Sequence, residues 1–228
     1  MSLKKEIMVK IKSAIVAAIC SMNLATAFAD VDPGVYFQIL GGASLMPGLS
    51  TSYQSGVETI QDNTTFKNGY NAMFAFGYRF PESLRTDLTV GYIDNRISSN
   101  YSNTINNNIQ SGSAEAYTFF GNLYYDFAAC SVLQPYVGAG LGYVTTRYKW
   151  QINNDTEANK YTTSPGFFGY QAVAGLNYHV TPNFGLLLDY RYVGTTTSTQ
   201  TISSTANSGK YNISFSSNLV SIGISYLF

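Results

Sequence analysis

Three features of the sequence predict an all-β fold, an eight-stranded antiparallel up-and-down transmembrane β-barrel. Apolar and polar residues alternate with a period of two in eight segments after residue 29, the pattern of strands whose two faces meet different surroundings. The connections between these segments alternate between short and long. Charged residues make up only 11% of the chain, against about 25% in a typical soluble domain, so one face of the strands is expected to meet lipid.

The first 29 residues are expected to be a cleaved signal peptide of the Sec route, and residues 30–228 the barrel. Four lysines precede an uncharged apolar run at 13–19, which is too short to cross a bilayer because a spanning helix needs about 20 residues. Residues 27–29, Ala-Phe-Ala, supply the small-x-small cleavage pattern. Met8 is an alternative start, since the segment from there to residue 29 is a complete signal by itself.

The charge balance of the mature segment gives no reason to expect nucleic acid as a partner. The chain has 13 basic and 13 acidic residues. Removing the four lysines of the signal leaves 9 basic residues, and removing Glu6 leaves 12 acidic ones. A net charge near −3 does not attract a polyanion.

Eight segments show the alternation and are the predicted strands. In the second of them, Tyr70, Phe74 and Tyr78 share one face. Phe215 lies on the opposite parity from the apolar residues of the last segment, so a bulge or an early strand end is expected there. The segments run from about 35 to 45, 69 to 80, 84 to 92, 117 to 127, 136 to 143, 170 to 180, 184 to 193 and 220 to 228.

The connections between the segments fall into two classes. Outer-membrane barrels have short periplasmic turns and longer loops outside the cell. Eight strands with both termini on the periplasmic side require three turns and four loops, which is the number that the sequence contains. The tight connections are 81–83, 128–131 and 181–183, and the long polar ones are about 46–68, 98–113, 149–165 and 195–212.

The aromatic face of the strands is predicted to contact lipid, and the other face to line the lumen. A soluble barrel would carry many Lys and Glu residues on its outer face, and neither face does. A Lys or Arg in the middle of a lipid face would cost about 2–4 kcal/mol. Aromatic residues near both strand ends are expected to form two interfacial girdles, although they favour strands in any case. The nearest charges on the aromatic parity lie at the loop-side ends: Asp94, Arg96, Glu115 and Arg147.

The opposite parity carries ionic side chains that are expected to fill the lumen. Eight strands leave room for side chains alone, and charges buried there must pair or cost several kcal/mol each. Three basic and three acidic residues balance one another, which favours a plug of ion pairs over a wide pore. This predicted interior network consists of Arg79, Arg85, Asp87, Asp126, His179, Asp189 and Arg191.

No catalytic, metal or cofactor site is predicted. His179 is the single histidine and lies beside a tight turn, so a structural role is expected rather than proton transfer. The sequence contains no metal-ligand spacing, phosphate-cradling loop or nucleophile elbow. Cys130 is the one cysteine after the signal, which excludes an intramolecular disulfide; it is either incidental or a reactive thiol on a periplasmic turn.

Four stretches carry a family likeness: 123–127 (Leu-Tyr-Tyr-Asp-Phe), 134–143 (Gln-Pro-Tyr-Val-Gly-Ala-Gly-Leu-Gly-Tyr), 189–192 (Asp-Tyr-Arg-Tyr) and 225–228 (Ser-Tyr-Leu-Phe). They resemble the outer-membrane β-barrel surface-antigen and opacity-like proteins, a group related to the transmembrane domain of the OmpA type. The end of the chain, with Tyr226 and Phe228, is similar to the signal that the barrel-assembly machinery reads. The resemblance implies a surface antigen in the cell outer membrane of a Gram-negative bacterium, sometimes linked to adhesion, and it offers no catalytic residues.

The expected function is that of a surface protein with four extracellular loops, in a structural or adhesive role. Its expected partners are outer-membrane lipids and lipopolysaccharide, the barrel-assembly machinery, and a host surface ligand reached through the loops. Loops that are only solvated connections are the plainer alternative. A narrow diffusion channel is the second hypothesis, because glycines reduce bulk on the inner face, although glycine also lets strands coil around a small barrel. A lipid-modifying enzyme is the third.

Overall fold

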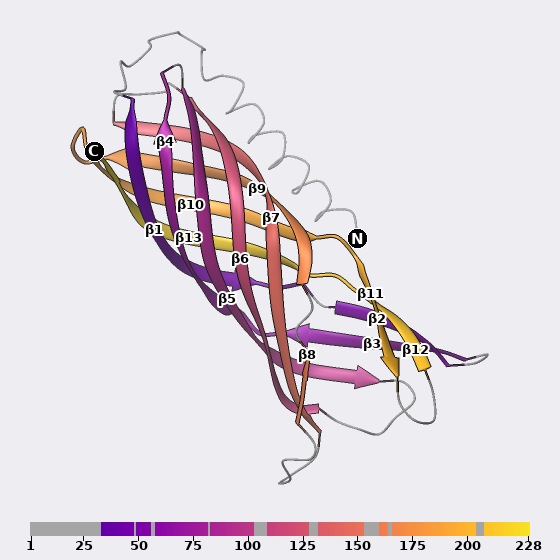
Figure 1. Ribbon diagram of the computed structural model, residues 1–228. Helices are drawn as coiled ribbons and strands as arrows, with labels where there is room; N and C mark the ends of the chain where they lie inside the picture. The colour runs from indigo at the N-terminus through magenta and orange to yellow at the C-terminus, as the bar shows by residue number, and fades with distance from the viewer. Residues whose placement is uncertain are drawn as a thin grey trace, which may run out of the picture.

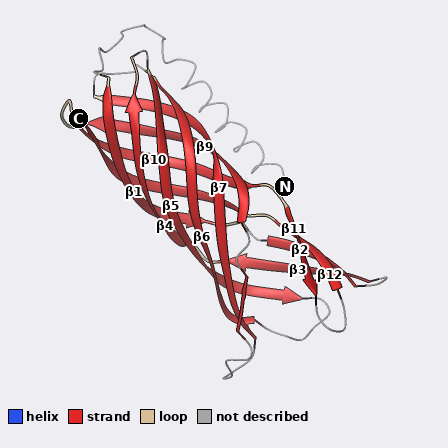
Figure 2. Cartoon of the chain, viewed as in Figure 1, coloured by secondary structure: helices blue, strands red, loops and turns tan. Residues whose placement is uncertain are grey.

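The computed structural model describes residues 33–47, 49–55, 58–81, 83–102, 109–127, 132–152, 160–163, 166–203 and 208–228. The expected signal peptide and Cys130 lie outside these residues. Among the residues described, no helix has the length and apolar character of a membrane span. Strands dominate the described chain (Figures 1 and 2).

Eight strands close into an antiparallel barrel, which confirms the predicted fold class. Going around it, each strand pairs with the next, and the last pairs with the first. In that order they are β1 (Gly34–Leu45), β4 (Gly69–Arg79), β5 (Leu84–Ser102), β6 (Ile109–Asp126), β7 (Leu133–Ile152), β9 (Gly166–His179), β10 (Phe184–Thr195) and β13 (Ser216–Leu227).

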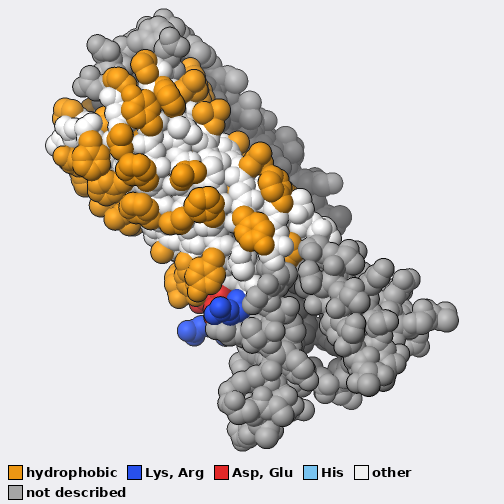
Figure 3. Space-filling view, viewed as in Figure 1, with side chains coloured by type: hydrophobic (Ala, Val, Ile, Leu, Met, Phe, Trp, Pro, Cys, Tyr) orange, Lys and Arg blue, Asp and Glu red, His pale blue; other side chains and the backbone are white. Residues whose placement is uncertain are grey.

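The register keeps residues of one parity on one side of the wall. Phe37 lies opposite Phe76, and Phe76 lies opposite Leu88, and directly opposed residues of antiparallel strands share a face. On this parity Leu123 is 57% and Ile222 70% exposed. The residues next to them in the sequence have the opposite parity, and Asn122, Tyr124 and Ser221 among them are buried. Figure 3 shows the resulting hydrophobic band on the outside of the barrel, as predicted.

Aromatic residues gather at both ends of this band. Pairs two residues apart on one strand have ring centroids 4.9 Å (Tyr78–Phe80) and 5.1 Å (Tyr125–Phe127) apart at the turn end. At the loop end the ring of Tyr92 lies between those of Tyr70 and Tyr117, with centroids 6.0 and 5.2 Å away. The tyrosine rings among them have an apolar body and a polar tip, and this suits them to the membrane interfaces.

The start of β1 and the C-terminus meet at the turn side. The Leu227 amide donates to the Asn183 carbonyl (2.8 Å), and the Phe228 amide donates to the Val35 carbonyl (2.9 Å). The turn before β5 is closed by the Phe80 amide, which donates to the Leu84 carbonyl (2.8 Å). The C-terminus therefore lies at the same end as the tight turns (Figure 1).

The described parts of the long connections are more regular than the sequence predicts. They contain further strands, and the barrel strands β5, β6 and β7 run well past their predicted loop-side ends. A strand that projects beyond the membrane meets water on both faces, so it needs no apolar alternation and leaves no period of two to detect. The additional strands are β2 (Leu49–Ser55), β3 (Glu58–Phe66), β8 (Lys160–Thr163), β11 (Ser198–Ser203) and β12 (Ser208–Ile213).

Four of these strands join the end of β5 in a second sheet, which we call the outer sheet. Its strand order is β11-β12-β2-β3-β5. The first long connection, which contains β2 and β3, therefore pairs with the last one, which contains β11 and β12. Residues 62–66 of β3 pair with residues 97–102 of β5. β8 instead extends the other side of the barrel by pairing with β7. Figure 1 shows the outer sheet projecting from the loop end of the barrel.

The early strand end expected at Phe215 is confirmed, because β13 begins at Ser216. Three hydrogen bonds join Thr195 and Phe215. The Phe215 amide donates to Thr195 Oγ1 (2.8 Å), and the Phe215 carbonyl accepts from the Thr195 amide (3.0 Å) and from Thr195 Oγ1 (3.2 Å). The Phe215 ring is buried in an apolar cluster with Leu219 and Val193. Phe215 therefore has the parity of a residue that points into the lumen, and its ring fills the lumen at the loop-side end of the barrel.

The lipid assignment of the wall predicts a depth-dependent cost for arginine. Leu141 lies midway between the girdles on β7, whereas Thr145 lies four residues nearer the loops. We expect Leu141→Arg to lower the free energy of unfolding in phospholipid vesicles by about 2–4 kcal/mol, and Thr145→Arg by about 0–1 kcal/mol. Denaturant titration followed by circular dichroism measures both. Equal costs at the two depths would contradict the assignment.

Candidate functional site

The charged side chains of the lumen lie together in its turn-side half. Arg85 and Arg79 face each other across β4 and β5, and Asp126 ends the neighbouring strand β6. Because these strands are tilted and neighbours share a face, inward residues from several strands meet at one level. We call this group the ionic layer: Arg79, Arg85, Asp87, Asp126, Asp189 and Arg191, all at most 6% exposed.

Asp126 holds two arginines at once. Arg85 Nε lies 2.9 Å from Asp126 Oδ1 and 2.7 Å from Oδ2, and Arg79 Nη2 lies 3.4 Å from Oδ2. Arg79 Nη2 also donates to Gln134 Oε1 at 3.4 Å. One carboxylate between two guanidinium groups leaves a surplus positive charge, which neighbouring groups must stabilise.

Three tyrosine rings surround the Arg85 guanidinium. Its Cζ atom lies 5.3 Å from the ring centroid of Tyr36, 5.0 Å from that of Tyr124 and 4.9 Å from that of Tyr136. Cations within about 6 Å of a ring face are attracted to it, by about 2 kcal/mol or more where water is excluded. The tyrosine cage therefore compensates for the lost hydration of a fully buried arginine.

Asp87 and Asp189 are stabilised in different ways. Asp87 accepts hydrogen bonds from neutral donors: the Tyr36 hydroxyl (3.1 Å), Thr89 (3.0 Å) and Asn122 Nδ2 (2.6 Å). Asp189 instead forms a two-pronged ion pair with Arg191 and also accepts from the Tyr136 hydroxyl (3.1 Å). The tyrosines thus link the cage of Arg85 to both carboxylates.

His179 lies at the turn-side edge of the ionic layer and is half-buried. Its Nε2 is 3.0 Å from Gln134 Oε1 and 3.4 Å from Asn177 Nδ2. These amides place it beside the Arg79 contact. Among the described residues, no group of three or more His, Cys, Asp or Glu residues is arranged to hold a metal ion.

Neighbouring side chains pack closely against the glycines of the inner face. At each of six positions, a neighbouring side chain occupies the space that a Cβ atom would fill. Glycine is therefore what lets bulky lumen residues lie against the wall. The pairs are Gly138 with Tyr124, Gly140 with Asn122, Gly142 with Phe120, Gly175 with Tyr136, Gly185 with Asn177 and Gly223 with Leu40.

Comparison with protein-family models matches residues 13–228 to the outer membrane protein beta-barrel domain. The chain belongs to this family. Family membership places the protein in the outer membrane of a Gram-negative bacterium. It does not decide what the barrel does there, because one fold supports many functions.

Individual relatives agree with this assignment. An uncharacterised protein of Brucella abortus is 29% identical over 152 residues, which cover 58% of this chain and 54% of that protein. The chain therefore spans about half the length of this curated relative. Two solved structures show the same fold, each at 14% identity: OprG from Pseudomonas aeruginosa, with 86% of this chain and 97% of that chain covered and a TM-score of 0.60, and a major outer membrane protein from Thermus thermophilus, with 85% and 99% covered and a TM-score of 0.56.

The sequence reasoning missed the tyrosine cage of this family member. Tyr36 and Tyr124 were not recognised as partners of Arg85, because their rings resemble those of the lipid face in composition. A usable signal was present, since each lies on the inward parity beside a glycine of the neighbouring strand: Tyr36 opposite Gly77 and Tyr124 opposite Gly138.

The C-terminal residues singled out for assembly lie on the outer wall. The rings of Tyr226 and Phe228 pack edge to face, 5.1 Å apart, and each ring centroid is 6.0 Å from that of Phe37. Phe228 is 70% exposed. Their reading by the barrel-assembly machinery of the outer membrane stays a prediction.

The Asp189–Arg191 pair provides a test of the ionic layer. We expect Asp189→Leu and Arg191→Met each to lower the free energy of unfolding by about 3–5 kcal/mol, because each leaves a buried charge unpaired. The double variant is expected to cost less than either single one, since no lone charge remains. Urea titration of the detergent-folded barrel measures all three. If both single variants are as stable as the parent protein, the ionic layer does not contribute to the stability of the barrel.

Proposed function

We propose that this outer-membrane barrel is a non-conducting anchor that presents its outer sheet at the cell surface, where the sheet binds a macromolecular ligand in adhesion to a host. The observation that carries the proposal is the outer sheet itself. Segments from the two ends of the mature chain pair there, with Tyr211 of β12 opposite Tyr53 of β2. A binding surface that is ordered before contact loses less conformational entropy when a ligand arrives.

The filled lumen supports the anchor role. Large side chains fill it along its length: Arg85 lies near the turns, Arg191 and Leu219 lie opposite each other on neighbouring strands, and Phe215 lies at the loop-side start of β13, all fully buried, as is Phe120. An eight-stranded barrel packed in this way leaves its extracellular side as the part free to interact. The same packing makes a diffusion channel the less favoured hypothesis, because large side chains occupy the path that ions would take.

The proposal assigns no catalytic step to the barrel. The three lumen carboxylates are engaged by arginine or by neutral donors and are nearly inaccessible. His179 contacts amides. A general acid or base needs both access to substrate and a position within hydrogen-bond reach of the reacting proton.

The loop-side rim is the proposed contact for lipopolysaccharide. Lys67, Arg96 and Arg147 are exposed just beyond the outer aromatic girdle, and Asp94 and Glu115 accompany them. Figure 3 shows charged side chains at this end of the hydrophobic band. Phosphate groups of a glycolipid lie at this depth, and arginine binds phosphate oxygens with two parallel hydrogen bonds.

Deletion of residues 50–64 tests the adhesive role of the outer sheet. The β1–β4 pairing runs from Gly34–Arg79 to Ser44–Gly69, and among the barrel strands the deleted segment pairs only with the end of β5 beyond the β4–β5 pairing, so the barrel is expected to fold. We expect attachment of bacteria carrying the variant to cultured host cells to fall several-fold. Surface labelling verifies equal display.

The matched control replaces residues 160–163 of β8, outside the outer sheet, with glycine and serine. Unchanged attachment after the deletion would refute the adhesive role of this segment.

Planar-bilayer recordings test the non-conducting lumen. We expect the refolded protein to give no steady single-channel steps, because ion pairs and rings fill the barrel. A variant with Phe120→Ala and Tyr124→Ala serves as the control for a lumen with two large side chains removed. Steady steps from the unaltered protein would favour the channel hypothesis instead.

A further inference from the structure

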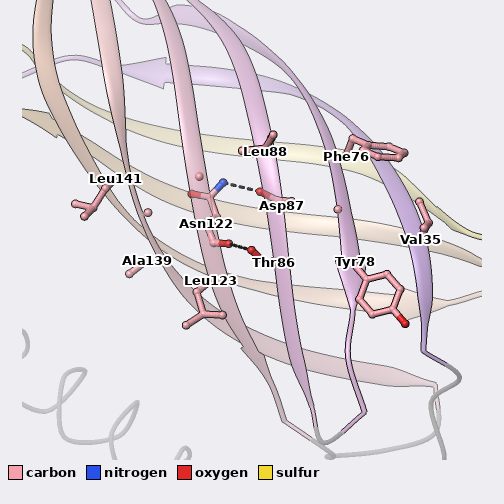
Figure 4. A pocket seen from close by; sticks show the side chains of 13 residues that line it. Val35, Phe76, Tyr78, Thr86, Asp87, Leu88, Asn122, Leu123, Ala139 and Leu141 are labelled. Carbon is pink, nitrogen blue, oxygen red and sulfur yellow. Dashed lines mark hydrogen bonds between the residues drawn. The ribbon is translucent and has the colours of Figure 1, made fainter.

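The lipid-facing wall has a hollow of about 620 Å³ over β4 to β7. Figure 4 shows it from close by, with Leu88, Leu123 and Leu141 on three successive strands around it and Tyr78 toward the turns. The hollow is an open depression of the wall and not an enclosed cavity. The hollow is separate from the ionic layer, which lies on the other side of the wall.

Alternation of large and small residues creates the hollow. Gly121 lies between Leu88 and Leu141 on the neighbouring strands. A Cβ atom at Gly121 would meet nothing closer than Leu88 Cδ2, at 3.8 Å. Unlike the lumen glycines, Gly121 therefore borders open space, and the three leucines form the walls around it.

The surface of the hollow is apolar. Thr86 and Tyr78 carry the hydroxyls on its outward side. The Thr86 hydroxyl donates to the Asn122 carbonyl at 2.8 Å, so that proton is already used, and Tyr78 lies at the turn-side edge. The side chains of Asp87 and Asn122 point to the lumen and are 3% and 4% exposed. A ligand that fills the hollow consequently needs no polar group there, which specifies hydrocarbon.

The hollow lies in the turn-side half of the membrane band. On β6 the band runs between Tyr125 at the turn girdle and Tyr117 at the loop girdle, and Leu123 and Gly121 occupy its turn side up to the middle. Turns face the periplasm in outer-membrane barrels. We infer that the hollow holds an acyl chain of a phospholipid from the periplasmic leaflet, which extends from that interface to the midplane.

A second copy of the chain fits the hollow less well than an acyl chain. In a two-fold symmetric contact the same surface faces itself, so one hollow would lie against another. A void at such a contact has no partner atoms and loses dispersion energy. A flexible hydrocarbon chain adapts to a concave surface without that loss.

Photo-crosslinking tests the inference. The mature protein is folded into vesicles of phosphatidylethanolamine and phosphatidylglycerol that contain a phosphatidylcholine with a diazirine at the middle of one acyl chain. Mass spectrometry is expected to find at least about fivefold more label on the hollow residues of β5 to β7 than on Leu188 and Ile222 of the opposite wall, since a preference of that size needs only a modest difference in affinity. Even labelling around the barrel would overturn the inference.

A variant that fills the hollow is tested in the same crosslinking experiment. Gly121→Leu is expected to reduce the label on the hollow to the level of the opposite wall, whereas Ala174→Leu, which introduces the same side chain on the lipid face of β9, leaves it unchanged. Ala139→Leu replaces the first variant if that one fails to fold. Label that persists in the filled variant, or crosslinked dimers joined at the hollow, would overturn the inference.

A second arm separates the two leaflets. In asymmetric membranes with diazirine-bearing lipopolysaccharide on the loop side, the hollow is expected to carry no more label than the opposite wall. Excess label from that lipid would overturn the assignment to the periplasmic leaflet.

Discussion

A closed ring of antiparallel hydrogen bonds, completed where β13 pairs with β1, is the constraint from which the other features of the barrel follow. No water satisfies backbone N–H and C=O groups inside a bilayer, so a sheet persists there only without edges. Closure also carries one parity around the whole barrel. A slip of one residue would turn the ionic layer toward lipid and the aromatic wall inward, so the same register positions both.

Closure with eight strands leaves a narrow lumen, and the ionic layer solves the resulting problem of burying six charges. Ion pairs neutralise most of the charge, neutral donors satisfy Asp87, and three tyrosine rings replace the hydration of Arg85. These rings fit because glycines lie opposite them. Stability here rests on matched groups, and a lone charge would cost more than the pair contributes.

The surfaces of the barrel have different tasks in the proposed account. The lumen is packed and contributes stability, the outer sheet offers an ordered surface beyond the membrane, and the wall contacts lipid, with one hollow shaped for a chain. The fold alone supports many activities. Function in this family member is therefore expected to depend on the surfaces that differ between barrels. These are the strands outside the membrane and the shape of the lipid-facing surface.

The amino-acid sequence was sufficient to predict the strand number and the two faces of the strands, because a membrane and a lumen impose opposite requirements on alternate residues. It did not reveal the outer sheet, whose strands meet water on both faces and show no alternation. Nor did it show that Tyr36 and Tyr124 enclose Arg85, or that Gly121 leaves a hollow while Gly138 accommodates a ring. Those outcomes depend on which residues of different strands lie opposite one another, and that is established only when the barrel closes in three dimensions.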